Sequence, residues 1–169
     1  MSMKQLIYII ILFSFCLCQI KIGDLAPNFS LTDENNKIHT LKEYKGKNVV
    51  LYFYPKDFTP GCTQQACSLR DISKELTDRN AIVLGISYDS GKKHNGFSKK
   101  YNLNFSLLSD KDKSISKLYE TKGWLFPKRK TFIINKEGQI AHIIDPVNII
   151  THNDIVLSVL DSLLISYPK

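Results

Sequence analysis

Two cysteines lie five residues apart in a segment whose residue types suit thiol chemistry. Cys62 directly follows a proline–glycine pair, where an apolar run gives way to a helical pattern. The first turn of a helix has free backbone N–H groups and the positive end of the helix dipole, and both favour a thiolate. The thiolate is the attacking form of cysteine, and Cys67 could resolve whatever Cys62 becomes after oxidation. The pair therefore indicates redox catalysis.

The other two cysteines, Cys16 and Cys18, belong to an apolar run near the N-terminus. The run covers residues 6–18 and follows a single lysine. Its length is typical of the apolar part of a signal peptide and is short for a membrane span. We expect residues 1–18 to be a signal peptide or a retained membrane anchor, with a buried helix as the alternative, and residues 19–169 to form the folded domain.

A targeting segment of this kind predicts export. The expected location is the periplasm, the exterior or an organelle lumen, with the cytoplasm as the alternative. Contact with a membrane is expected only through residues 1–18, if they are not cleaved.

Composition indicates one ordinary globular domain. The 169 residues are 43% hydrophobic and 23% charged, enough for a single full core. Although 23 basic and 16 acidic residues give a net charge of +7, the basic residues are scattered, so we expect a solvated surface and no nucleic-acid partner. No metal or other cofactor is expected, because no spacing completes a zinc site among the histidines, His39, His94, His142 and His152.

Hydrophobic patterns alternate between strand and helix. Continuous apolar runs at 49–54 and 81–87 predict buried central strands. Apolar residues at three- and four-residue spacing predict one helix over residues 62–80. One shorter strand is expected just before a turn at 33–37, and others at 38–41, 107–109, 131–135 and 139–144. Further helices are expected at 92–101 and 113–119. A last helix is expected to run from a cap at Asn153 and Asp154 to residue 164. This order predicts an α/β sandwich with a mixed central sheet flanked by helices.

The segment Thr-Pro-Gly-Cys-Thr at 59–63, preceded by Tyr-Phe-Tyr-Pro-Lys-Asp at 52–57 and followed by Cys67, resembles the active-site segment of the peroxiredoxins. More narrowly it resembles the Q type, also called bacterioferritin comigratory proteins. The similarity extends from residues 23–29 to the hairpin at 131–138. The resemblance implies a thioredoxin-like fold and a thiol peroxidase that reduces hydrogen peroxide and organic hydroperoxides in antioxidant defence.

The resemblance also implies a role for each matching residue. Cys62 is the peroxidatic cysteine and becomes a sulfenic acid. Thr59 offers its hydroxyl to the thiolate and the peroxide, and Pro60 shields the site from water. Arg129, whose guanidinium is always charged, would face the thiolate and the peroxide oxygens. The structural alternatives are turn residues at Thr59 and Pro60, plain surface charge at Arg129, and an inert buried thiol at Cys67.

Two residues depart from the family pattern. Gln65 stands where the family commonly has glutamate, so it can still form hydrogen bonds but cannot form an ion pair with Arg129. Phe58 replaces a residue that is usually small or polar, and we expect it to alter access to the pocket.

Helix geometry constrains how the two cysteines could react with each other. Five residues of an α-helix rise about 7.5 Å, whereas a disulfide needs Cα atoms within roughly 7 Å. Resolution of Cys62 by Cys67 in one subunit therefore requires the helix to unwind, and it needs no second subunit, so a monomer is expected. The reductant implied is thioredoxin or a similar dithiol protein.

Two other functions stay open. An exported thiol–disulfide oxidoreductase is disfavoured because the sequence lacks Cys-x-x-Cys in this domain. A secreted chaperone or sensor whose cysteine pair responds to peroxide would consume peroxide stoichiometrically, not catalytically.

Overall fold

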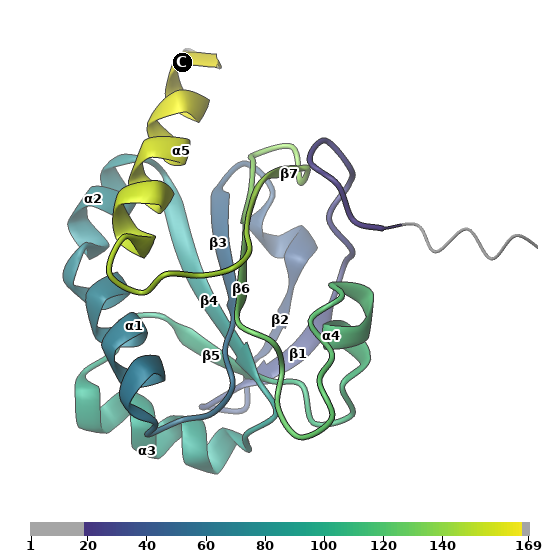
Figure 1. Cartoon of the computed structure of the whole chain (residues 1–169), viewed down its shortest axis with the longest axis vertical. Coiled ribbons are helices and arrows are strands. Elements are labelled where there is room, and N and C mark those ends of the chain that lie inside the picture. Colours follow the sequence, from purple (N-terminus) through teal and green to yellow (C-terminus); the bar gives the residue numbers. More distant parts are fainter. Residues whose placement is uncertain (1–18, 167–169) are drawn as a thin grey trace, which may run out of the picture.

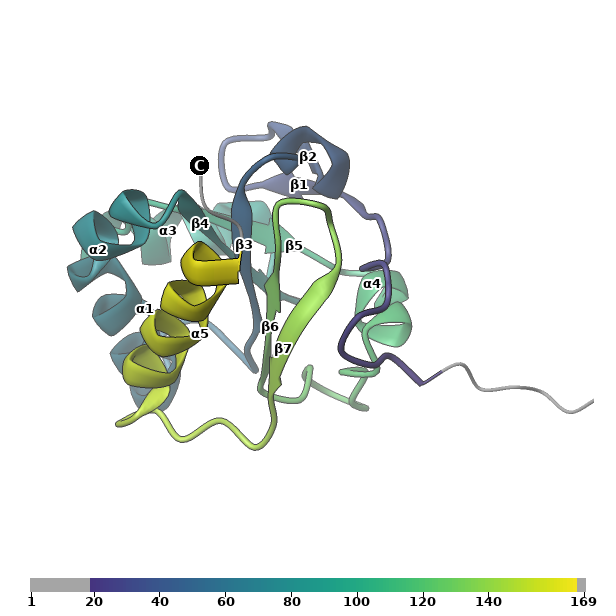
Figure 2. The same cartoon turned by 90° about the horizontal axis from the view of Figure 1, so that it is seen from above.

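The computed structural model describes residues 19–166 as one mixed sheet with helices on both faces (Figures 1 and 2). The strands of this part of the chain are β1 (Ser30–Asp33), β2 (Ile38–Thr40), β3 (Asn48–Phe53), β4 (Ala81–Ser87), β5 (Ser106–Ser109), β6 (Lys130–Ile134) and β7 (Ile140–Ile144). Its helices are a 3₁₀ turn η1 (Leu41–Tyr44), α1 (Pro60–Asp71), α2 (Ser73–Asp78), α3 (Gly91–Tyr101), α4 (Ser114–Leu118) and α5 (His152–Ser166).

The sheet has the strand order β2-β1-β5-β4-β3-β6-β7. Strands β3, β4 and β5 are parallel, and β6 pairs antiparallel with β3. Because β6 runs the other way, it begins beside the end of β3, where Lys130 is paired with Phe53. This register brings the residue before β6, Arg129, to the edge of the sheet from which α1 departs. The predicted mixed α/β sheet is confirmed.

Each face of β3 packs into its own core, as the alternation of side chains along a strand requires. Val50 and Tyr52 join a core beneath the layer of α1, α2, α3 and α5, which Figure 2 shows on one side of the sheet. Val49, Leu51 and Phe53 join the second core, on the side of α4. The strand that leads into the loop before α1 is therefore buried on both faces.

Several predicted boundaries were wrong. The single helix predicted at 62–80 begins earlier, at Pro60, and is broken at Ile72, which separates α1 from α2. Proline is favoured at the first helical position because its missing N–H has no partner there in any case. Asn153 and Asp154 lie inside α5, which begins at His152. The 3₁₀ turn η1 was not predicted.

The predicted targeting segment, residues 1–18, lies outside the described part of the chain. Within residues 19–166 no helix has both the length and the apolar character needed to cross a membrane.

Candidate active site

The candidate nucleophile lies in the first turn of α1. β3 ends at Phe53, a short loop follows, and the extended residue Thr59 precedes the helix. Cys62 is the third helical residue, so its backbone N–H is among those without an intrahelical acceptor. Its side chain is only 1% exposed. The predicted position of Cys62 near a helix N-terminus is confirmed.

Arg129 supplies a cation to this buried sulfur. Its Nη2 donates a hydrogen bond to Cys62 Sγ over 3.2 Å. Its Nη1 donates to Oε1 of Gln65, one turn further along α1. The two donors fix the plane of the guanidinium, so Gln65 orients the arginine through a hydrogen bond where a glutamate would form an ion pair.

A chain of contacts behind Arg129 was not predicted from the sequence. Because Arg129 can only donate, Gln65 must accept through Oε1, and its amide nitrogen faces His152 Nε2 at 3.5 Å. Thr131 Oγ1 lies 3.0 Å from the same ring nitrogen. Burial, with the nearby charge of Arg129 as the second cause, lowers the pKa of His152 to about 4. His152 is therefore neutral at pH 7 and accepts at Nε2.

This histidine predicts a loss of stability in acid. Its pKa is about 4 in the folded chain and 6.5 ordinarily, so between these values the unfolded chain binds the extra proton and stability falls as pH falls. From pH 7 to pH 4 the group should cost about 3 kcal/mol. Urea unfolding across this range should give a shallower pH dependence for His152→Asn than for the parent chain. If the two chains lose stability equally as pH falls, His152 is not the group that causes the loss.

Close packing over the start of α1 explains the glycine before the nucleophile. A Cβ on Gly61 would lie 3.1 Å from Ile149 Cδ1 and 3.6 Å from Arg129 Nη2. The first distance is tighter than an ordinary van der Waals contact. A Cβ at this position would therefore press on Ile149, while its contact with the Arg129 guanidinium would be an ordinary one.

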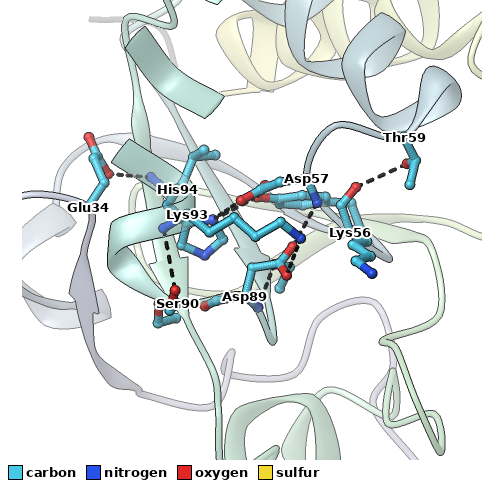
Figure 3. Close-up of polar contacts among 12 residues, drawn as sticks. Glu34, Lys56, Asp57, Thr59, Asp89, Ser90, Lys93 and His94 are labelled. Carbon is cyan, nitrogen blue, oxygen red and sulfur yellow. Dashed lines mark hydrogen bonds and ion pairs between the residues drawn. The ribbon is translucent and has the colours of Figure 1, made fainter. Parts of the chain in front are cut away.

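Thr59 and Phe58 occupy the loop just before α1. The Thr59 hydroxyl donates to Lys56 O over 3.0 Å (Figure 3). Phe58 has a positive φ of 66°, which is uncommon for a bulky residue and costs conformational energy. Its ring packs edge-on against Phe97 of α3, with the centroids 5.1 Å apart, and also contacts Tyr101. Phe58, which departs from the family pattern, thus attaches this loop to α3.

A buried polar network holds the residue before Phe58. Asp57 Oδ2 is 2.8 Å from Nδ1 of His94, on α3, and Asp57 Oδ1 accepts from the Tyr54 hydroxyl over 2.7 Å. All three side chains are fully or almost fully buried. Burial raises the pKa of Tyr54 well above its usual value, which keeps the hydroxyl a neutral donor.

The same network reaches the surface through a second acid. The backbone N–H of Asp57 donates to Asp89 Oδ2 over 2.7 Å, and Lys93 Nζ lies 2.7 Å from Asp89 Oδ1. Figure 3 shows Asp57 and Asp89 next to the side chains of Lys93 and His94, which belong to α3. The loop between β3 and α1 (residues 54–59, the catalytic loop) therefore contacts α3 directly through Asp57–His94 and Phe58–Phe97. It also contacts Asp89, which is paired with Lys93 of α3.

Cys67 lies in the same helix as Cys62, on its half-buried side, and both are free thiols. Three residues on, Arg70 donates to Tyr101 O and forms an ion pair with Asp71. The end of α1 is thus also fastened to α3.

The structure brings Cys62 and Arg129 into contact. Thr59 directly precedes the helix that carries Cys62, and Pro60 is the first residue of that helix. Cys67 lies five residues further along α1, about 1.4 turns from Cys62. Among residues 19–166 no group of three or more histidine, cysteine or acidic side chains could hold a metal ion.

Comparison with known proteins assigns this chain to a family. The model of the AhpC/TSA family matches residues 22–143. A putative peroxiredoxin Bcp of Coxiella burnetii is 43% identical over 141 residues, 79% of this chain and 93% of its own length. Peroxiredoxin Bcp of Escherichia coli K12 is 41% identical over 147 residues, 82% of this chain and 94% of its own.

Solved structures agree. BcpB of Mycobacterium tuberculosis superposes with a TM-score of 0.80 at 32% identity, covering 85% of this chain and 98% of its own. PrxQ of Xylella fastidiosa gives 0.80 at 31% identity, covering 85% and 96%. The chain belongs to the AhpC/TSA family, and within it to the Q-type or Bcp peroxiredoxins. It is a thiol-dependent peroxidase with a thioredoxin-like fold.

Proposed function

We propose that the chain reduces hydrogen peroxide and organic hydroperoxides with Cys62 as the attacking thiol. The observation that carries the proposal is the 3.2 Å hydrogen bond from Arg129 Nη2 to Cys62 Sγ in a buried site. The sulfur attacks one peroxide oxygen, an S–O bond forms and the O–O bond breaks. Cys62 becomes a sulfenic acid, and the other oxygen leaves as water or an alcohol after taking a proton. The guanidinium supports the charge on both oxygens.

Two further residues shape the pocket. Thr59, whose hydroxyl is directed by Lys56 O, orients the peroxide through its oxygen lone pairs. Pro60, at the first helical position, limits access of water to the sulfur.

Cys67 resolves the sulfenic acid within the same chain. Its sulfur attacks Cys62 Sγ, a disulfide forms, and the sulfenic oxygen leaves as water. Five helical residues rise about 7.5 Å, beyond the reach of a disulfide, so the first turns of α1 must unwind first. Thioredoxin or a similar dithiol protein then reduces the disulfide and is itself oxidised. This cycle serves antioxidant defence and cell redox homeostasis, and it can operate in a monomer.

The chain is exported in this proposal, with residues 1–18 as the signal peptide or anchor. N-terminal sequencing of the mature protein tests this directly. A mature chain that begins near residue 19 supports cleavage, and one that retains residues 1–18 in a cytoplasmic fraction contradicts export.

Two serine variants test the cycle in a thioredoxin–thioredoxin reductase assay. Cys62→Ser should abolish peroxide-dependent turnover, because the attacking sulfur is gone. Cys67→Ser should still consume one peroxide per chain and then stop, because the sulfenic acid has no partner. Continued turnover by Cys62→Ser would contradict the role of Cys62. One peroxide per chain from the parent, with reductant in excess, would instead favour the sensor function.

A further inference from the structure

Three consecutive apolar side chains project from the loop between α4 and β6. Trp124, Leu125 and Phe126 are 86%, 60% and 43% exposed. Single exposed apolar residues are ordinary on a soluble domain, but a contiguous group marks an interaction site. The peroxidase cycle uses none of the three.

Hydrogen bonds fix the backbone that displays them. The N–H of Gly123 donates to the Tyr88 hydroxyl over 3.3 Å, and Lys113 Nζ donates to Trp124 O over 2.7 Å. A Cβ on Gly123 would lie 2.0 Å from Phe126 O, so only glycine fits this tight turn. The loop is therefore built to present its apolar side chains outward.

Basic residues surround this tip. Lys56 Nζ lies 5.5 Å from the centre of the Phe126 ring, and Lys122 and Lys128 are exposed on either side of the apolar group. Residues 111–130 carry seven basic and two acidic side chains, a net charge of +5 out of +7 for the whole chain. Of these residues, Arg129 contacts Cys62 and Lys130 is paired with Asp145. The basic side chains that flank the exposed tip itself are Lys56, Lys122 and Lys128.

We propose that this loop, Trp124-Leu125-Phe126 with its flanking lysines, binds the surface of membranes that contain anionic lipids. Aromatic and leucine side chains enter the boundary between headgroups and acyl chains, and each lysine near an anionic surface adds electrostatic attraction. A second copy of this chain fits less well, because a two-fold contact would set the lysines against one another.

Binding in this way orients the active site. Lys56 directly precedes Asp57 of the catalytic loop, and the apolar loop leads into Arg129, which contacts Cys62. The membrane-bound chain therefore holds the mouth of the thiol site close to the lipid. The proposal concerns binding alone, so it does not depend on the catalytic cycle, and Cys62→Ser must bind vesicles as the parent does.

The chain contains a single tryptophan, so the emission of Trp124 reports on this loop alone. The full chain is titrated with phosphatidylcholine vesicles, with and without phosphatidylglycerol, that carry brominated acyl chains. Vesicles with phosphatidylglycerol should shift the emission to the blue and quench it. Apparent affinity for neutral vesicles, or at high salt, should be about tenfold lower or more.

Two variants distinguish binding through this loop from non-specific binding of exposed apolar residues to lipid. Leu125→Glu should lose the shift and the quenching, because a carboxylate opposes both insertion and the anionic surface. Ile38→Glu changes another exposed apolar residue, on β2 at the far edge of the sheet, and should respond as the parent does.

Four results would overturn the proposal. These are an equal response to neutral vesicles, no quenching by either vesicle, quenching of Leu125→Glu at the parent level, and a shift that needs no lipid. A lipid-free shift that grows with protein concentration would assign the loop to self-association, and one that appears only with thioredoxin would assign it to the reductant.

Discussion

Replacing Arg129 with methionine is expected to lower the second-order rate constant for peroxide reduction by about 10²- to 10³-fold. The methionine fills similar space but removes the donors to Cys62 Sγ and to Gln65. The rate constant of Arg129→Lys should lie between those of the parent and Arg129→Met. A single ammonium group cannot hold the sulfur and the Gln65 amide together in the fixed geometry of a guanidinium. Stopped-flow mixing of the reduced variants with hydrogen peroxide measures the rate constant.

Arg79→Met is the matched control for this prediction. Arg79 is paired with Asp161 on the surface, so its loss should leave the rate within about twofold of the parent. A rate for Arg129→Met that equals that of Arg79→Met would show that the guanidinium has no part in the attack.

Replacing Asp57 with alanine is expected to lower the free energy of unfolding by about 3 kcal/mol, a shift of melting temperature on the order of 10 °C. The change leaves two buried polar groups, His94 Nδ1 and the Tyr54 hydroxyl, without their carboxylate partner. It also detaches the catalytic loop from α3. Amide hydrogen exchange in the first turn of α1 should therefore rise together with the loss of stability.

The control for Asp57 is an acid whose partner is exposed. Asp78 is paired with Lys74 on α2, and Asp78→Ala should cost no more than about 0.5 kcal/mol. If Asp57→Ala has the same melting temperature as Asp78→Ala, the buried network does not hold the loop.

Local patterns in the sequence predicted most of the fold. The apolar run of β3 and the proline–glycine pair before Cys62 are signals carried by neighbouring residues, and both are borne out. The break at Ile72 was missed because apolar spacing continues across it, so periodicity alone does not separate α1 from α2. The 3₁₀ turn η1 is too short to show any period.

The contacts that complete the site depend on pairing across the fold. Arg129 contacts Cys62 because β6 pairs antiparallel with β3 in one register. The family resemblance implied this contact, but local sequence patterns could not predict it. His152 lies 87 residues from Gln65 in the chain, and the two are neighbours only because α5 packs against the sheet. No signal in the sequence distinguished His152 from the other histidines.

The attachment of the catalytic loop to α3 was missed for the same reason. Asp57 and His94 are 37 residues apart. In the sequence, Asp57 belongs only to the motif at 52–57 and His94 to the helix predicted at 92–101, so local patterns did not connect them. Phe58 was recognised as unusual, but its positive φ and its contact with Phe97 follow only from the tertiary packing.

Peptide mapping by mass spectrometry after one equivalent of hydrogen peroxide tests the central claim most directly. The account predicts a single intrachain disulfide between Cys62 and Cys67 in the parent chain, and a sulfenic acid at Cys62 in Cys67→Ser. Oxidation found first at Cys67, a disulfide between two chains, or two thiols left unchanged would contradict it.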